Sequence, residues 1–585
     1  MFHQLLEPVG NNLLLSFLVG LIPILVVLVL LGIIRRPAWQ AALSGLVVAF
    51  IIAVLVWKMP VGLAASSTLA GFAFAILPVM WIVWNAMWLY NVAVRSGKFD
   101  LFRRWMIHNV PADKRILLLI IGFSFGALLE GVAGFGTPVA IGSALLISLG
   151  FPALEAITLT LMFNTTPVAF GALGAPVVTL AAVTGLPINA LSAMIGRQLP
   201  IFALILPFYA LIFFTGFRSL RTVWPVALIA GVSFAVTQFA VSNFISPALP
   251  DVLASLVSLV CVILFVQIWK PSDIEQYRVN FAGALAGSGG TMASQGEAEA
   301  PPVWATAGRD EVDAPAIGEK HIPVSTTVAD SPVADIGRKP TFGEAVLAWL
   351  PWVLVAVVVV IWTYLAVANK VGQMNIAWPG LDKAVYLTLY HKPYAAVYNL
   401  QLLGTGTAIL VTVILTAIFL RVSPRLFFLA LADTWKQLRF AILTVVLIVG
   451  LAYLYNYSGM AYTLGLAVSS LGAVFPFFAV FLGWIACFLS GSDTSSNALF
   501  GNLQVVAARQ LHLSPILMAS TNSSGAVMGK MVSPQNVTTG VSTTNLIGKE
   551  GLIIRRTFFH SIFLAVLLGL LVLAQQYLIP GIIPH

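Results

Sequence analysis

The chain has 585 residues, of which 59% are hydrophobic and only 9% are charged, and its formal net charge is +9. Soluble globular proteins contain about 45–50% apolar residues, so this composition excludes a soluble domain and predicts a polytopic membrane protein. The positive charge is explained by basic residues in cytoplasmic loops, and we expect no nucleic acid among the partners. Cys261 and Cys487 lie in apolar stretches and indicate neither a disulfide nor a metal site. No cofactor is expected.

Apolar stretches long enough to cross a membrane begin at residues 13–34 and recur as far as residues 558–578. A helix needs about 20 apolar residues to span a bilayer core about 30 Å thick. The first stretch has no cleavage-like flank, so we expect a retained span and not a signal peptide. Clusters of Lys and Arg, such as those that include Arg115, Arg218 and Lys270, mark cytoplasmic loops, and satisfying them requires about twelve crossings with both termini outside. This topology also places residues 368–401 outside, although they include three lysines.

Two interruptions follow in the amino-terminal half, at LLEGVAGFGTPVAI (residues 128–141) and at NTTPVAFGALGAP (residues 164–176). Glycine and proline interrupt helices, and the helical arms beside the first interruption are each about half as long as a bilayer is thick. We therefore expect residues 116–150 to form a re-entrant helical hairpin with its tip at residues 131–137. Residues 152–187 are expected to form a broken helix.

Residues 271–340 are rich in Gly, Ala, Ser, Pro, Glu and Asp and poor in large apolar residues. Such a composition cannot bury a core, so we predict a disordered cytoplasmic linker. The linker divides the chain into an amino-terminal transmembrane half, residues 1–270, and a carboxy-terminal half, residues 341–585. If the chain contains an internal duplication, the two copies are expected to lie on either side of this linker.

The carboxy-terminal half repeats the pair of interruptions, at FLSGSDTSSNALF (residues 488–500) and at NSSGAVMGKMVSP (residues 522–534). The second Asn motif follows the first by 358 positions, with a glycine and a proline at matching offsets. We expect a hairpin over residues 475–511 and a broken helix over residues 514–548, entered from the opposite side of the membrane. The two repeats are then inverted. The alternative is that the two pairs are unrelated glycine-rich kinks.

Broken helices at membrane depth indicate a cavity, because unpaired backbone groups are tolerated there only inside protein or facing water. Inverted repeats of this kind place a substrate near the bilayer midplane, where helix N-termini present N–H groups to an anion. The expected ligand is a small carboxylate, bound by donors at the breaks of both repeats. The predicted substrate-binding residues are Asn164, Thr165, Thr166, Asn522, Ser523, Ser524, Gly131 and Gly491.

A few charged residues stand within apolar segments, where an ionisable side chain costs on the order of 2.5–3.5 kcal/mol and usually faces a cavity or a partner. Glu130 and Asp493 lie at the hairpin breaks and are the candidates for carrying a proton, the alternative being that they cap the broken ends. Arg197 and Lys530 are candidates for pairing with the substrate anion. Alternatively, Arg197 extends to the membrane interface and Lys530 is a structural partner of Asp493.

The motifs LLEGVAGFGTPVA, NTTPVAFGALGAP, GRQLP, YNYSG and GSDTSSNALF resemble the signatures of the bacterial L-lactate permease family. The resemblance covers most of the chain outside the linker. It implies a proton-coupled importer of lactate, and often of glycolate, in the bacterial cytoplasmic (inner) membrane. The family is in turn similar to ion transporters in which a transport domain with re-entrant hairpins moves against a scaffold like an elevator.

Energetics also favours proton coupling, because importing a monoanion into an inside-negative cell costs about 2.3 kcal/mol per 100 mV and an added proton makes the step electroneutral. Coupling to sodium through carbonyl and hydroxyl oxygens remains an alternative, as does an anion channel. An enzyme is disfavoured, because the sequence contains no His-Glu-x-x-His motif and no convincing Ser/His pairing. The expected partners are the carboxylate substrate, protons and the lipid bilayer, and the sequence does not indicate an oligomeric state.

Overall fold

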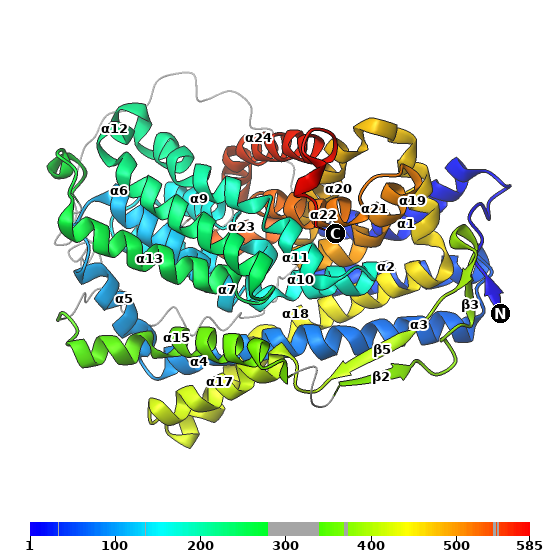
Figure 1. Ribbon diagram of the computed structural model, residues 1–585, viewed down its shortest axis with the longest axis horizontal. Coiled ribbons are helices and arrows are strands. Elements are labelled where there is room, and N and C mark those ends of the chain that lie inside the picture. The colour runs from blue at the N-terminus through cyan, green and yellow to red at the C-terminus, as the bar shows by residue number, and fades with distance from the viewer. Residues whose placement is uncertain are drawn as a thin grey trace, which may run out of the picture.

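The computed structural model describes residues 1–584 except residues 33, 35, 135, 279–337, 368–372, 542–543, 545 and 547–548. Long apolar helices account for most of the described chain, and many of them run roughly along the longest axis of the molecule (Figure 1). Most of the predicted linker lies outside the described residues, so its disorder stays a prediction, as does the division of the chain into two halves.

The amino-terminal half contains the first long helices, an amphipathic helix, the first pair of interrupted segments and a set of helices that closes this half. Its elements are β1 (Phe2–His3), α1 (Leu13–Gly32), α2 (Ala38–Leu55), α3 (Val61–Phe74), η1 (Ala75–Met80), α4 (Trp81–Arg95), α5 (Lys98–His108), α6 (Lys114–Leu117), η2 (Leu118–Phe125), α7 (Gly126–Val132), α8 (Thr137–Ser148), α9 (Ala153–Phe163), η3 (Val168–Phe170), α10 (Gly171–Thr184), α11 (Ile188–Ile195), α12 (Leu199–Phe244), α13 (Pro250–Ile268) and η4 (Ile274–Tyr277).

The carboxy-terminal half begins with a long helix and short strands and ends with the second pair of interrupted segments and a last long helix. Its elements are α15 (Phe342–Tyr364), β2 (Gln373–Ala377), β3 (Val385–Leu387), η6 (Thr388–Tyr390), β4 (Lys392–Pro393), β5 (Val397–Gln401), α17 (Thr405–Phe419), α18 (Pro424–Ser458), α19 (Met460–Val468), η7 (Ser469–Val474), α20 (Phe475–Ser490), α21 (Asp493–Gln510), α22 (Pro515–Lys530), α23 (Pro534–Val541), α24 (Glu550–Tyr577) and η8 (Pro580–Ile582).

Ten helical stretches among the described residues are long and apolar enough to cross a membrane, or eleven if a bent pair, residues 153–163 and 168–184, counts as one span. One of the ten, residues 188–244, contains α12, whose backbone is non-helical at Gly216. Gly231 of α12 lies against the backbone of Leu204, so the two parts of α12 are antiparallel. This stretch therefore crosses twice, which brings the number close to the twelve predicted. The fold is an all-α polytopic membrane protein, as expected.

Each pair of interrupted segments begins with a helical hairpin. In the first hairpin, α6, η2 and α7 form one arm and α8 forms the other, and the turn contains Gly134 and Gly136, both with positive φ. In the second hairpin, α20 and α21 are joined at Gly491, which has a φ of 69°. A helix commonly ends at a residue of this left-handed conformation, which glycine adopts without a steric penalty. The glycines are therefore the local reason that the chain reverses at these points.

The two pairs of interrupted segments pack against each other reciprocally. Helix α10 of the first broken helix packs on α21 of the second hairpin, and α23 of the second broken helix packs on α8 of the first hairpin. The hairpin tips also meet a common element, because the Asn536 side chain of α23 donates to the carbonyl of Gly491 (3.0 Å) and lies beside Gly136. This exchange is what a pseudo-twofold relation between the repeats requires. The inverted-repeat relation itself remains a prediction.

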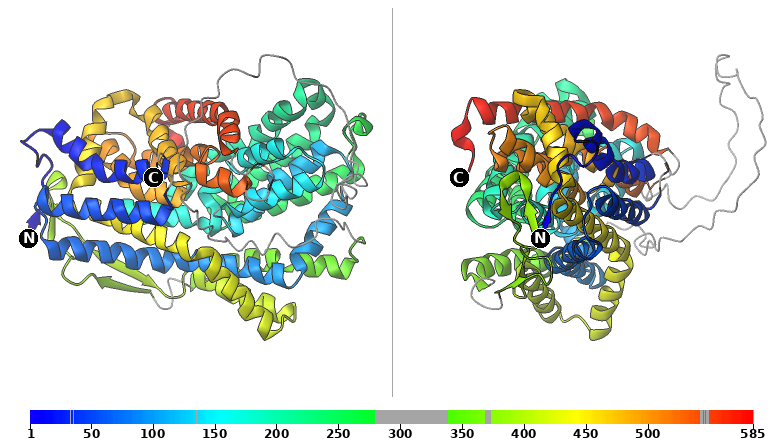
Figure 2. Two further views of the ribbon diagram at one scale, coloured as in Figure 1. Left: turned by 180° about the vertical axis from the view of Figure 1, so that it is seen from behind. Right: turned by 90° about the vertical axis from the view of Figure 1, so that its right-hand side faces the viewer.

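Short strands form two small sheets beside the long helices. β1 pairs in parallel with β3, which pairs antiparallel with β4, and β2 pairs antiparallel with β5. Figure 1 and the rear view in Figure 2 show β3 beside the N-terminus, whereas β2 and β5 run alongside α3, and Tyr398 of β5 donates to the carbonyl of Leu77 (2.8 Å). The N-terminus therefore lies next to residues 385–393, and the predicted common side of residues 368–401 and the N-terminus stays a prediction. That this side faces the cell exterior, and that the C-terminus does so too, remain predictions.

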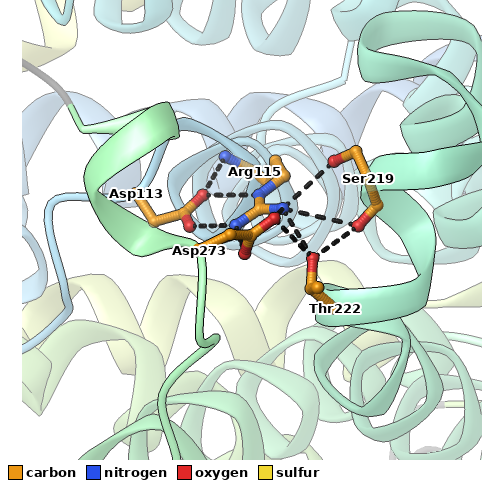
Figure 3. A network of polar contacts seen from close by, with 5 residues as sticks. All are labelled: Asp113, Arg115, Ser219, Thr222 and Asp273. Atoms are coloured by element: carbon orange, nitrogen blue, oxygen red, sulfur yellow. Dashed lines mark hydrogen bonds and ion pairs between the residues drawn. The ribbon is translucent and has the colours of Figure 1, made fainter.

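A buried arginine joins three segments that the sequence places on the cytoplasmic side (Figure 3). Arg115 lies in α6, and its guanidinium binds the carboxylate of Asp113 (2.6 Å) and the carboxylate of Asp273 (2.8 Å). It also donates to the hydroxyl groups of Ser219 (3.1 Å) and Thr222 (3.0 Å) in α12. The start of the first hairpin, the middle of α12 and the segment after α13 are thus tied together at one point.

Candidate functional site

A small cavity lies where the two hairpin tips meet the first broken helix. Its lining includes Glu130 and Gly134 of the first hairpin, Asp493 of the second hairpin, Ala172 of α10 and Lys530 of α22. The volume is about 30 Å³, which is enough for one or two water molecules and smaller than a lactate ion. Two segments about 360 residues apart in the sequence, those around residues 130 and 493, thus contribute to one cavity.

Two of the lining residues form a buried ion pair. Lys530 Nζ lies 2.7 Å from Glu130 Oε1, and both side chains are almost completely buried. The second oxygen of Glu130, Oε2, has no hydrogen-bond partner among the described residues. A Cβ on Gly171 would lie 2.7 Å from Glu130 Oε1, so a side chain at this position would displace the carboxylate. The structure corrects the alternative that Lys530 is a structural partner of Asp493, because Lys530 forms its ion pair with Glu130.

Asp493 lies at the other hairpin tip, as the first residue of α21. Its Oδ2 accepts a hydrogen bond from the Ser523 hydroxyl (2.6 Å), while Oδ1 has no partner within the described chain. Ser523 also accepts a hydrogen bond from Asn497 Nδ2 (3.2 Å). The cap of α21 is Ser492, whose side chain accepts from the Ser495 backbone N–H. Asp493 is therefore available for a role other than capping this helix.

The structure corrects the expectation that Asn522, Ser523 and Ser524 lie at a helix break. They lie inside α22, which is continuous to Lys530, and the interruption comes between α22 and α23. The sequence explains the difference, because the first motif reads NTTP whereas the second reads NSSG, with no proline before Pro534. Ser524 donates its hydroxyl hydrogen to Gln198 Oε1 (2.7 Å), away from the cavity lining.

Asn522 is fully occupied by contacts within the second pair of segments. Its Oδ1 accepts from Gln504 Nε2 (2.8 Å), and its Nδ2 donates to Asn497 Oδ1 (2.9 Å) and to the Ser496 carbonyl (3.3 Å). These bonds join α22 to α21 of the second hairpin. The Asn522 side chain thus has a structural role in this conformation and offers no free donor to a carboxylate.

Asn164 does lie at a break, but at the C-terminal end of α9 and not at a helix N-terminus as expected. It is the C-cap of α9, its side chain is buried, and neither Nδ2 nor Oδ1 has a partner among the described residues. The hydroxyl groups of Thr165 and Thr166 make long hydrogen bonds, of 3.5 Å, to carbonyls of α9. The first break thus holds an unsatisfied amide, which costs free energy unless a ligand or water binds it.

The first break, Asn164 to Thr166, does not line the cavity in this conformation, and neither do Arg197 and Gly131. Arg197 donates to Asn243 Oδ1 (2.9 Å) and to the carbonyl of Ile582 near the C-terminus, so its guanidinium is bound by groups outside the cavity lining. Gly131 lies in the last turn of α7 and not in the turn of the hairpin, and it packs against Asp251 at the start of α13. Gly491, by contrast, does line the cavity.

Sequence reasoning missed the buried pair of Asp251 and Gln238. Asp251 stands at the edge of an apolar stretch in SPALPDVL, where a carboxylate is usually assigned to a solvated span end. Its complete burial results from the packing of α13 against α7 and the second part of α12. Only the tertiary arrangement shows it, because Gln238 precedes it by 13 residues on another helix.

Comparison with known proteins identifies the family. The family model for L-lactate permease matches residues 16–307 and 317–579. The glycolate permease GlcA of Escherichia coli (strain K12) is 38% identical over 593 residues, which cover 99% of both chains. The L-lactate permease of Bacillus subtilis (strain 168) is 37% identical over 99% of both chains, and that of Escherichia coli (strain K12) is 36% identical over 100% of both chains. The chain therefore belongs to the L-lactate permease family.

Proposed function

We propose that the protein imports L-lactate, and also glycolate and related 2-hydroxy monocarboxylates, across the bacterial cytoplasmic membrane by symport with protons. The relatives named for L-lactate and glycolate support the substrate class, since they align over nearly the whole chain. The observation that carries the mechanism is the buried ion pair between Lys530 and Glu130 at the cavity.

The ion pair provides a way to couple a proton to an anion. Lys530 is the one cation in the cavity lining of the described residues, and Glu130 occupies it. Removing one partner from a buried ion pair costs about 3–5 kcal/mol, because the other charge is left uncompensated. A substrate carboxylate therefore replaces Glu130 at Lys530 at low cost only when Glu130 is protonated. Proton and substrate then favour each other's binding, which is the property that symport needs.

Asp493 is the second proposed proton-binding residue. With Glu130 and Asp493 both ionised, the cavity lining carries one net negative charge, and an arriving carboxylate adds another. Charge in a buried site of this kind is costly unless it is paired. A proton on Asp493 removes this repulsion, and the Ser523 hydroxyl remains as a hydrogen-bond partner of the neutral acid.

We assign the 2-hydroxyl and the carboxylate of the substrate to donors at the first break. Asn164 has both amide atoms unpaired, and Thr165 and Thr166 adjoin it. Because the cavity is smaller than lactate, the hairpin tips must separate when substrate enters. Such a separation is compatible with a mobile unit formed by the hairpins and broken helices that moves against the remaining helices.

The function is tested with purified protein in liposomes, by uptake of labelled L-lactate under an imposed pH gradient or an imposed sodium gradient. We expect uptake with the pH gradient alone. Glu130→Gln should abolish gradient-driven uptake and retain measurable exchange between equally loaded compartments, since exchange runs without releasing the proton. Uptake driven only by sodium would establish the sodium alternative. Full gradient-driven uptake by both Glu130→Gln and Asp493→Asn would show that neither residue is the coupling site.

The substrate contact is tested by comparing two cation variants. Lys530→Gln should weaken lactate binding at least tenfold, measured by isothermal titration on protein with a normal thermal unfolding profile. Arg197→Gln is the matched control, because Arg197 binds Asn243 and the C-terminal segment outside the cavity. An equal loss of affinity in both variants would show that Arg197 also binds the substrate, as the sequence suggested.

A further inference from the structure

Asp251 is a buried carboxyl group that the proposed coupling through Glu130 and Asp493 does not use. It is the second residue of α13, and it is completely buried. A Cβ on Gly131 of α7 would lie 3.0 Å from Asp251 Cβ, so the carboxyl group is next to the last turn before the first hairpin tip. No cation within the described part of the chain forms an ion pair with it at 4.0 Å or less.

The hydrogen bonds of Asp251 connect it to the first break. Oδ1 accepts from Gln238 Nε2 (3.2 Å), and the same Nε2 donates to the carbonyl of Thr166 (3.2 Å). Because both partners are acceptors, the orientation of the Gln238 amide is fixed by this network. Oδ2 of Asp251 has no partner among the described residues, and the same holds for Oε1 of Gln238. The network therefore leaves one carboxyl oxygen open.

The charges that face Asp251 come from the ion pair at the cavity. Helix α7 supplies Glu130 and α22 supplies Lys530, and both act electrostatically on Asp251. Among the other elements packed on α13, η2 and α10 contain no titratable side chain, α12 supplies the neutral Gln238, and α15 carries titratable groups only near its two ends, Glu344 and Tyr364. An ionised carboxylate with one neutral donor and no cation is unfavourable at such depth. The neutral acid is thus the form that fits this conformation, with its proton on Oδ2.

We propose that Asp251 is a further proton-binding residue of the transport cycle, positioned by Gln238 and exposed to water when the first hairpin tip moves. This inference rests on the proposed proton symport. One proton binds Asp251 Oδ2 from the outside and leaves from the same oxygen to the cytoplasm in each cycle, with no other bond formed or broken. The contact between Gly131 and Asp251 Cβ makes this side chain sensitive to the tip, because displacement of α7 removes part of the protein that covers it.

The test is the number of protons moved with each lactate, measured in proteoliposomes as the pH gradient that just balances an imposed lactate gradient. Asp251→Asn mimics the neutral acid and should lower this number by one, with measurable lactate exchange retained. Ser255→Ala is the matched control one turn further along α13, since the Ser255 hydroxyl bonds, within the described residues, only to the Val252 carbonyl. It should leave the number unchanged.

A second variant separates a coupling role from a structural one. Gln238→Met removes the donor without changing the titratable group, so it should shift the pH midpoint of lactate exchange and keep the proton number of the unmodified protein. If Asp251→Asn does not insert into the membrane, Gln238→Met still tests the inference. An unchanged proton number in folded Asp251→Asn, or an unchanged pH midpoint in Gln238→Met, would overturn the inference. A lack of pH-gradient-driven uptake in the unmodified protein would instead overturn the proposed function.

Discussion

Asn164 and Asn522 occupy equivalent positions of the repeated motif but differ in their hydrogen bonding. Asn164 ends α9 with an unpaired amide, whereas Asn522 lies inside α22 with both amide atoms bonded. The residue three positions later accounts for this difference, because Pro167 interrupts the first helix and Gly525 leaves the second intact. The two repeats therefore contribute unequally to the site, with the first break offering free donors and the second providing support.

This asymmetry predicts opposite consequences of the same substitution. Asn164→Ala should weaken lactate binding about tenfold, because a hydrogen bond to the substrate worth ~1–3 kcal/mol is lost, without lowering thermal stability. Asn522→Ala should lower thermal stability, because it leaves Gln504 and Asn497 without their partner. Binding isotherms and unfolding temperatures of both variants check this. A loss of stability in Asn164→Ala with normal binding would contradict the assignment.

At the scale of elements, the second hairpin and the second broken helix pack with their backbones in contact. Gly483 of α20 lies against the carbonyl of Asn522, and Gly525 and Gly529 of α22 lie against the carbonyls of Val480 and Trp484. Small residues spaced four apart allow membrane helices to approach closely. The glycines in NSSGAVMG, which the sequence suggested as helix breakers, therefore serve helix packing.

Gly525→Ala tests this packing. A Cβ at residue 525 would lie 2.2 Å from the Val480 carbonyl oxygen, so α20 and α22 must separate, at a cost of about 1–3 kcal/mol. We expect a lower unfolding temperature in detergent and a faster loss of transport on heating. Gly62→Ala in α3 is the control, because nothing lies within 4 Å of its Cβ position. Equal stability of the two variants would argue against close packing of these helices.

At the scale of the whole molecule, the Arg115 network connects segments distant in the sequence. It holds α6 and α12 to the segment after α13 and therefore fixes one end of the helices around the first hairpin. Hydrogen bonds from Arg115, aided by one from Thr222, keep the pKa of Asp273 below its ordinary value, although burial acts in the opposite direction. A depressed folded-state pKa makes the carboxylate a source of stability that depends on pH.

Asp273→Asn should therefore lower the unfolding temperature near neutral pH, because the variant loses an interaction worth on the order of 1–3 kcal/mol. Because the pKa is lower in the folded state, the stabilisation is present above the ordinary pKa of Asp, about 3.9, and is lost as pH falls through the folded value. The difference from the unmodified protein should shrink below about pH 4. Glu275→Gln, which removes an exposed ion pair with Arg278, should change little. A difference that does not depend on pH would contradict this account.

The sequence by itself determined the features that depend on composition and local order. Apolar length predicted the spans, glycine and proline predicted interruptions near residues 131–137 and 491, and the motifs indicated the family that the comparisons confirm. The basic residues in the loops predicted that residues 115, 218 and 270 lie on one side of the membrane. The structure joins the segments next to these residues through the Arg115 network. Each of these features is encoded within some tens of consecutive residues, which is why the order of residues along the chain is enough to predict it.

Only the tertiary structure decided which side chains meet. Glu130 and Lys530 are 400 residues apart, and local order does not show that Lys530 pairs with Glu130 and not with Asp493. The same holds for the burial of Asp251 beside Gln238 and for the hydrogen bond between Arg197 and Asn243. The matching motifs suggested two similar breaks, yet packing of α22 on α20 and α21 keeps the second helix continuous past Asn522. Partner choice between buried polar groups depends on the relative position of helices, which arises from packing over the whole chain.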